Sequence, residues 1–115
     1  MSGGIASWVT AEASGLNESR AAEAAAFRHV CGSLRDATAQ RNRASRAAAV
    51  RKTKRLWHAV LIAVAHPESP LPMPLRQGLA TLGTSVLAEL DRHEPDLAFL
   101  LAVNEQILAG LAPYH

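Results

Sequence analysis

The chain contains a single cysteine, Cys31, and only 4% of its 115 residues are aromatic. One cysteine cannot form an intramolecular disulfide, and nothing in the sequence indicates an oxidising compartment. The shortage of aromatic residues and of consecutive β-branched residues disfavours β-strands, whereas the abundant alanine favours helix. The sequence therefore predicts an all-α protein located in the cytoplasm.

Long apolar runs are also missing. The longest, residues 56–65, is interrupted by His58, whereas a transmembrane helix needs about 20 apolar residues. Residues 1–10 lack the basic start and the apolar stretch of a secretory signal. We therefore expect neither a membrane partner nor export of the protein.

Sequence motifs that mark catalytic or metal sites are absent as well. The five histidines form no HExxH pair, and His29 and Cys31 would point to different faces of a helix. No nucleophile elbow, carboxylate pair or phosphate-binding glycine loop occurs. We therefore expect no enzyme activity, cofactor, metal or small-molecule substrate, and interpret Cys31 as a small apolar core residue.

What the sequence does contain is enough apolar material for one core. Hydrophobic residues make up 49% of the chain, and a chain of this length usually forms one domain. Residues 1–16, with scattered Gly and Ser, are interpreted as a partly ordered lead-in. Residues 17–115 are expected to form a small helical bundle of about four helices.

Apolar residues recur at helical spacing in the first half of that bundle. The first helix is expected from Asn17 or Ser19 to about Ala39. A second helix, capped by Ser45, is expected to reach about His66. The predicted core residues of these two helices are Phe27, Val30, Cys31, Leu34, Val50, Trp57, Val60, Leu61 and Val64.

Four prolines between positions 67 and 74 separate the two halves of the bundle. Proline lacks the N–H donor that a helix interior requires, so an extended connector is expected here. Pro74 suits the first turn of a third helix, and Pro95 is expected to open a fourth that ends at Pro113. The predicted buried stripes are Leu75, Leu79, Leu82, Val86 and Leu90, then Leu97, Leu101, Ile107, Leu108 and Leu111.

The charges are distributed unevenly along the chain. Residues 1–66 hold ten of the twelve lysines and arginines against four acidic residues, and residues 67–115 hold two against six. The two halves therefore either attract one another within the chain or face different partners.

Seven of the twelve basic residues lie within positions 41–55. Arg51, Lys52 and Arg55 are expected to project from the second helix on the side opposite its apolar stripe. Such a cluster neutralises phosphates in nucleic-acid-binding proteins, but it lacks the interleaved aromatic residues that stack bases. A solvated face or a protein contact is the preferred interpretation, and a nucleic-acid contact is the alternative.

Asn104 is the most informative polar residue because it lies in the middle of an apolar stripe. A buried amide without partners costs ~1–3 kcal/mol. We therefore expect Asn104 to bond an exposed backbone group, in the proline-rich connector, and so to fix the register of its helix.

The chain resembles the FlaF family of flagellar biosynthesis regulators over residues 18–112, in the order and spacing of several sequence blocks. The blocks are Arg20, Glu23, Phe27, Val30 and Leu34; residues 54–57; residues 71–76; Leu82 and Val86; and Asn104 with residues 110–111. Thr53, Ser69 and Ser85 depart from the family pattern, which usually has Asn, Asn and Trp at these positions.

The resemblance implies a role in flagellar assembly, in which FlaF proteins promote flagellin production and engage flagellin before export. Flagellin is accordingly the expected partner, bound in a chaperone-like manner that couples its synthesis to export. The expected contact is a groove between the third and fourth helices, formed by Leu71, Leu75, Arg76, Asn104 and Gly110. The alternative is an RNA-binding regulator of flagellin expression that uses residues 41–55.

Overall fold

The computed structural model describes residues 13–68 and 72–111, and within these ranges the side chains of residues 22–68 and 72–110. It contains four helices, α1 (Ala13–Gln40), α2 (Arg43–Ala65), α3 (Met73–Leu90) and α4 (Leu97–Leu111), and no strand in the described ranges. The predicted all-α bundle of four helices is confirmed. Among these helices, none combines the length and the apolar character that a membrane span needs.

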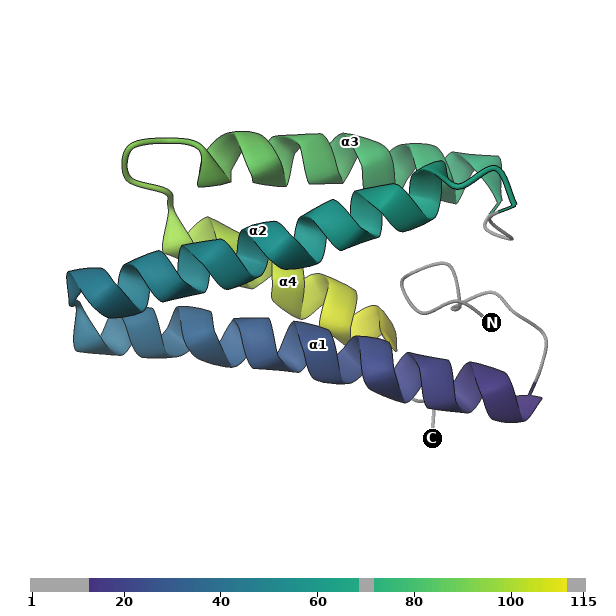
Figure 1. Cartoon of the computed structure of the whole chain (residues 1–115), viewed down its shortest axis with the longest axis horizontal. Helices are drawn as coiled ribbons and strands as arrows, with labels where there is room; N and C mark the ends of the chain where they lie inside the picture. The colour runs from purple at the N-terminus through teal and green to yellow at the C-terminus, as the bar shows by residue number, and fades with distance from the viewer. Residues whose placement is uncertain (1–12, 69–71, 112–115) are drawn as a thin grey trace.

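The helices pack as neighbours in the order α3, α2, α1, α4 (Figure 1). The end of α2 and the start of α3 lie at the right of the figure, and we call this the connector end. The α1–α2 turn and the α3–α4 loop lie at the left, and we call this the turn end. The start of α3 and the end of α4 therefore point towards the same end of the bundle.

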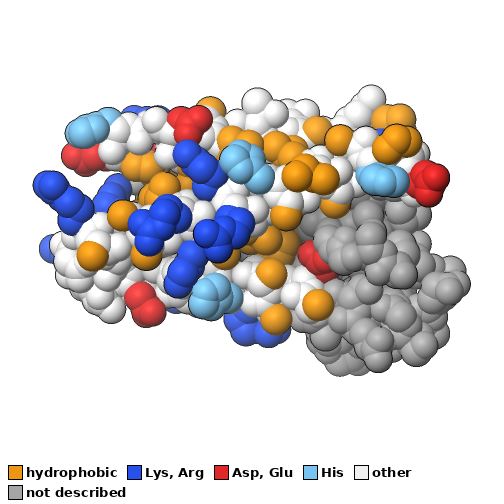
Figure 2. Space-filling view, in the orientation of Figure 1, with side chains coloured by type: hydrophobic (Ala, Val, Ile, Leu, Met, Phe, Trp, Pro, Cys, Tyr) orange, Lys and Arg blue, Asp and Glu red, His pale blue; other side chains and the backbone are white. Residues whose placement is uncertain are grey.

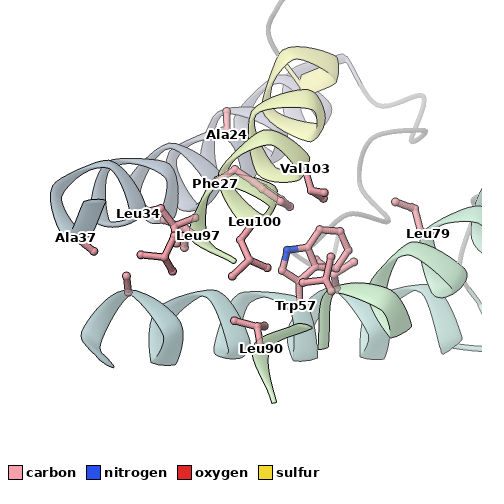
Figure 3. Packing of buried hydrophobic residues seen from close by; sticks show 14 of the residues in the cluster. Ala24, Phe27, Leu34, Ala37, Trp57, Leu79, Leu90, Leu97, Leu100 and Val103 are labelled. Carbon is pink, nitrogen blue, oxygen red and sulfur yellow. The ribbon is translucent and has the colours of Figure 1, made fainter. Parts of the chain in front are cut away.

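The core lies between the helices and includes residues from all four. Phe27, Leu34, Trp57, Val86 and Leu100 are fully buried (Figure 3). The Phe27 and Trp57 rings meet edge to face with their centroids 6.2 Å apart, an arrangement that aromatic pairs prefer. The predicted core positions of α1 and most of those of α2 are thus confirmed.

Not every residue of the predicted stripes in α3 and α4 is buried. Leu79, Val86, Leu90 and Leu97 are buried, whereas Leu75 is exposed. Leu82, Leu101, Ile107 and Leu108 are only partly buried at the edge of the core. The side chain of Leu111 lies outside the described residues. Leu100 and Val103, which the pattern did not include, are buried in their place because α4 turns that face towards α1.

Close packing of α3 on α2 depends on one glycine. Gly83 is buried in the middle of α3. A Cβ atom at this position would lie 2.6 Å from Cδ2 of Leu61, which is closer than side chains approach. The absence of a side chain at Gly83 therefore allows α3 to lie against α2.

The start of α2 differs from the prediction. Asn42, and not Ser45, is the N-cap, because its Oδ1 accepts a 2.7 Å hydrogen bond from the backbone N–H of Ser45. The preceding residue, Arg41, has a φ of 55°, a conformation that costs a non-glycine residue about 1–2 kcal/mol. Its N–H donates to Ala37 O and closes α1. The turn between α1 and α2 is therefore short and tightly defined.

The starts of α3 and α4 are set by neighbouring residues. Pro74 lies in the first turn of α3, as predicted. Pro95 does not open α4, however: the helix begins at Leu97, and Asp96 accepts a 3.1 Å bond from the backbone N–H of Phe99. Asp96 is thus the residue that caps α4.

Two ion pairs connect the basic first half of the chain to the acidic second half. Arg35 pairs with Glu105 at 2.6 Å, and Lys54 pairs with Asp91 at 2.9 Å. Exposed pairs of this kind contribute about 0–1 kcal/mol each. These ion pairs therefore neutralise part of the charge asymmetry within the bundle. They link α1 to α4 and α2 to the end of α3.

Candidate functional site

Asn104 lies in the centre of the bundle and bonds to a tryptophan. The indole Nε1–H of Trp57 donates a 3.0 Å hydrogen bond to Asn104 Oδ1, and both side chains are fully buried. Asn104 Nδ2 in turn donates to the carbonyl of Leu100 at 2.7 Å. The first bond satisfies the indole and joins α2 to α4, and the second lies within α4.

This arrangement corrects the expected partner of Asn104. The partners of Asn104 in the described residues are the indole of Trp57, 47 positions away, and the backbone carbonyl of Leu100, and neither belongs to the connector. Because Asn104 is fully buried, its place in the core makes it a structural residue, and a partner cannot touch it without opening the bundle.

The other residues predicted for partner binding lie towards the connector end. Leu75 is exposed and Arg76 is half-buried at the start of α3, and Gly110 is exposed in the last turn of α4. Leu71 lies outside the described residues. α3 packs chiefly on α2 and α4 chiefly on α1, so these two helices do not form a closely packed pair. A contact with a partner at these positions stays a prediction.

Arg76 already binds a helix end within its own chain. Its Nε donates to Val64 O at 2.9 Å, and its Nη2 donates to His66 O at 3.3 Å. These carbonyls belong to the last turn and the C-cap of α2, which have no intrahelical donor. Arg76 therefore fastens the start of α3 to the end of α2, and only part of its guanidinium is left for a partner.

Four exposed residues form a single stripe along the outward side of α2. Arg51, Arg55, His58 and Ile62 follow one another at intervals of four, three and four positions, which places them on one side of a helix. We call this set the α2 stripe. Arg51 and Arg55 form no ion pair with a carboxylate in the described parts of the chain, and Lys52 bonds to Ser33 Oγ at 3.4 Å. The stripe is therefore basic towards the turn end.

Three large apolar side chains are exposed near the connector end, in the last turn of α2 and the first turn of α3. Ile62 is 72% exposed, Met73 is 56% exposed and Leu75 is 37% exposed. Figure 2 shows hydrophobic side chains over α3 and the second half of α2, beside the lysines and arginines that gather over the first half. We call the α2 stripe together with Met73 and Leu75 the α2–α3 surface. It combines cationic and apolar side chains, a combination that suits an amphipathic partner.

The sequence pattern did not identify Ile62 or Met73 as surface residues. Ile62 lies within the longest apolar run, and the sequence pattern does not predict it to be exposed. At 100° per residue it is rotated about 140° from Trp57 around the helix axis, so its register alone already places it away from the core. Met73 precedes Pro74 and belongs to no periodic stripe.

The positions that depart from the family pattern differ in their surroundings. Thr53 is fully buried, and its hydroxyl donates to Ala49 O at 2.7 Å within α2. Ser85 is exposed on α3, away from the core. Ser69 lies outside the described residues. Thr53 is thus accommodated without a partner from another helix.

Two buried titratable groups lie on α1. Burial raises the pKa of the Glu23 carboxyl from 4.5 to about 7, and the residue is only 8% exposed. Burial also raises the pKa of the Cys31 thiol, with Arg35 lowering it and Glu105 raising it further. Cys31 is fully buried, as expected of a core residue. Within the described ranges, no three His, Cys, Asp or Glu side chains lie close enough together to hold a metal ion.

Comparison with known proteins identifies one family. The model of the family described as flagellar protein FlaF matches residues 7–111, which is most of the chain. A search of curated proteins and a search of solved structures each found no significant match.

Proposed function

The chain belongs to the FlaF family of flagellar proteins, and we propose that it binds flagellin in a chaperone-like manner and couples flagellin synthesis to export. The terminal segments of monomeric flagellin are amphipathic, and their apolar faces are buried only in the filament. A helical protein that covers such a face before the filament assembles keeps the flagellin monomer soluble.

The observation that supports this proposal is the α2–α3 surface. Ile62, Met73 and Leu75 are large apolar side chains exposed near one end of a pair of packed helices. An amphipathic helix recognises such a surface through apolar residues at intervals of three and four positions. Exposed apolar residues are ordinary when they are scattered, whereas a cluster marks a site of protein interaction, and here three lie in the last turn of α2 and the first turn of α3.

The basic part of the α2 stripe adds orientation to that contact. Arg55 and Arg51 lie about one and two helical turns from His58, respectively, towards the turn end. A carboxylate on the bound segment that reaches either guanidinium fixes the direction in which the segment lies. Fully exposed pairs contribute little affinity, so the apolar part of the surface supplies most of the binding free energy.

The exposed arginines also support the second candidate function, which is RNA binding. Arg51, Lys52 and Arg55 are all exposed on α2, as a contact with phosphates requires. Trp57, the aromatic residue nearest to them in the sequence, is fully buried and cannot stack on a base. Flagellin binding is therefore the proposal that the surface favours.

The proposal is tested by titrating the isotopically labelled full-length protein with peptides from the two ends of flagellin. We expect the largest amide shifts at residues 58–65 and 73–78. Shifts confined to other helices would move the contact elsewhere on the bundle. No shifts at millimolar peptide would contradict flagellin binding by its terminal segments.

A further inference from the structure

A separate pocket lies at the turn end, away from the apolar part of the α2–α3 surface. It has a volume of about 780 Å³, is open on one side and is lined by the end of α1, the start of α2, the α3–α4 loop and the start of α4. Ala37 and Leu97 lie at its base and are buried, and Ala98 contributes an exposed apolar side chain. A cavity of this volume lies in the range of small-molecule sites.

The lining of this pocket is strongly basic. Arg41, Arg43, Arg46 and His93 all contribute to it, against one acidic residue, Glu94. Neither Arg41 nor Arg43 forms an ion pair with a carboxylate in the described part of the chain. Two guanidinium groups are thus available in a concave site, where charges are less screened than on an open surface.

The third arginine holds the pocket together. Arg46 Nη2 donates to the carbonyl of Pro95, a residue 49 positions away in the α3–α4 loop. This bond fixes the loop that carries His93 and Glu94 against the start of α2. The two segments that line the pocket are therefore held together by this bond.

Arg41 occupies a backbone conformation that favours glycine. Its φ of 55° lies in the left-handed region, and glycine is the usual residue where a helix ends in this way. An arginine at this position reduces the stability of the turn and places a guanidinium at the pocket. Residues held in such conformations tend to occur at functional sites.

From the pocket we infer a further site, which binds a small phosphate ester of about nucleotide size. Planar guanidinium groups bind phosphate oxygens through paired hydrogen bonds. A lone phosphate would leave most of about 780 Å³ unfilled, whereas an organic body attached to it would fill that space and cover Ala98, which is exposed. The inference does not depend on flagellin binding, because the pocket shares no residue with the α2–α3 surface.

The test is calorimetric titration of the full-length protein with adenosine monophosphate, inorganic phosphate and adenosine. We expect the nucleotide to bind at least tenfold more tightly than inorganic phosphate, and adenosine not to bind. Amide shifts should appear at Thr38, Asn42 and Ala98, which line the pocket. Absence of binding by both phosphates at millimolar concentration would overturn the proposal, as would binding of an acidic peptide in their place.

Arg41→Gly makes this test specific, because glycine suits the backbone at that position. We expect this variant to melt at or above the temperature of the parent protein and to bind the nucleotide at least tenfold more weakly. Arg51→Ala, which removes an exposed arginine outside the pocket, is the matched control and should retain the affinity. Equal losses in the two variants would indicate diffuse attraction to the basic half of the chain and would contradict a site.

Discussion

The indole N–H of Trp57 donates to the side-chain oxygen of Asn104, and this bond joins α2 to α4 in the middle of the core. α4 otherwise packs chiefly on α1, so the bond provides a direct polar link between two helices that are not principal packing partners. Phe27 on α1 lies edge to face against the same indole. Three helices thus converge on Trp57, and its surroundings define how they are aligned.

We expect Asn104→Leu to cost about 1–3 kcal/mol of unfolding free energy, because it leaves the buried indole N–H without an acceptor. In a Trp57→Phe background the same change should cost less, since no N–H remains to be satisfied. A double-mutant cycle from chemical denaturation measures the difference. Thr53→Val is the matched control, because the hydroxyl of Thr53 bonds only within α2, and its cost should not depend on the residue at position 57. Purely additive effects of the Trp57 and Asn104 substitutions would contradict the link between these two side chains.

The buried Glu23 carboxyl predicts a dependence of stability on pH. Its pKa of about 7 in the folded protein exceeds the ordinary value of 4.5, so the folded state binds the proton more tightly than the unfolded state. Stability should therefore fall as the pH rises from about 4.5 to 7, by up to about 3 kcal/mol. Glu23→Gln should remove this decrease and stabilise the protein at pH 8.

The control for that experiment is Asp36→Asn, which changes an exposed acidic residue on the same helix. Thermal unfolding of the parent and both variants between pH 5 and pH 8 separates the two effects. Parallel curves for the parent and Glu23→Gln would contradict a raised pKa at Glu23.

Arg76 is expected to contribute to stability, because it bonds the carbonyls of Val64 and His66 at the end of α2. Arg76→Ala should cost about 1–2 kcal/mol by chemical denaturation. Arg92→Ala removes an exposed arginine whose ion pair is with Glu89 on the neighbouring turn, and it should cost less than about 0.5 kcal/mol. Equal losses of unfolding free energy in Arg76→Ala and Arg92→Ala would show that the bonds of Arg76 to α2 do not stabilise the protein.

Much of the fold was predictable because it depends on local patterns. The spacing of apolar residues identified four helices, and the prolines between positions 67 and 74 separated α2 from α3. Phe27 and Trp57 were placed in the core by register alone, which works because a helix repeats every 3.6 residues. The caps were less predictable, since Asn42 and Ser45 are both good N-cap residues and only the path of the turn decides between them.

The site was less predictable than the fold because it depends on contacts between distant parts of the chain. The partner of Asn104 lies 47 positions away, and no pattern along α4 indicates which helix faces it. Arg76 and the end of α2 meet through a connector whose path the prolines do not determine. The pocket at the turn end brings Arg41 and His93 together from two separate loops, which a sequence read in order does not reveal.

The RNA-binding alternative makes a separate prediction about salt. Affinity for RNA should fall steeply as salt rises, and replacing Arg51, Lys52 and Arg55 together should weaken binding to all sequences alike. We expect no appreciable binding in a mobility-shift assay near physiological salt, because Trp57, the aromatic residue nearest to these side chains in the sequence, is fully buried. Sub-micromolar, sequence-selective binding to a flagellin leader transcript would favour the alternative.

Binding of monomeric flagellin by two matched variants tests the central claim most directly. Leu75 and Phe99 are exposed to nearly the same extent, 37% and 39%, but only Leu75 belongs to the α2–α3 surface. With purified full-length proteins, Leu75→Glu should weaken the complex at least tenfold, or about 1.4 kcal/mol, whereas Phe99→Glu should bind flagellin as tightly as the parent protein does. Failure of the parent protein to bind flagellin at micromolar concentration, or equal affinities of the two variants, would contradict the account.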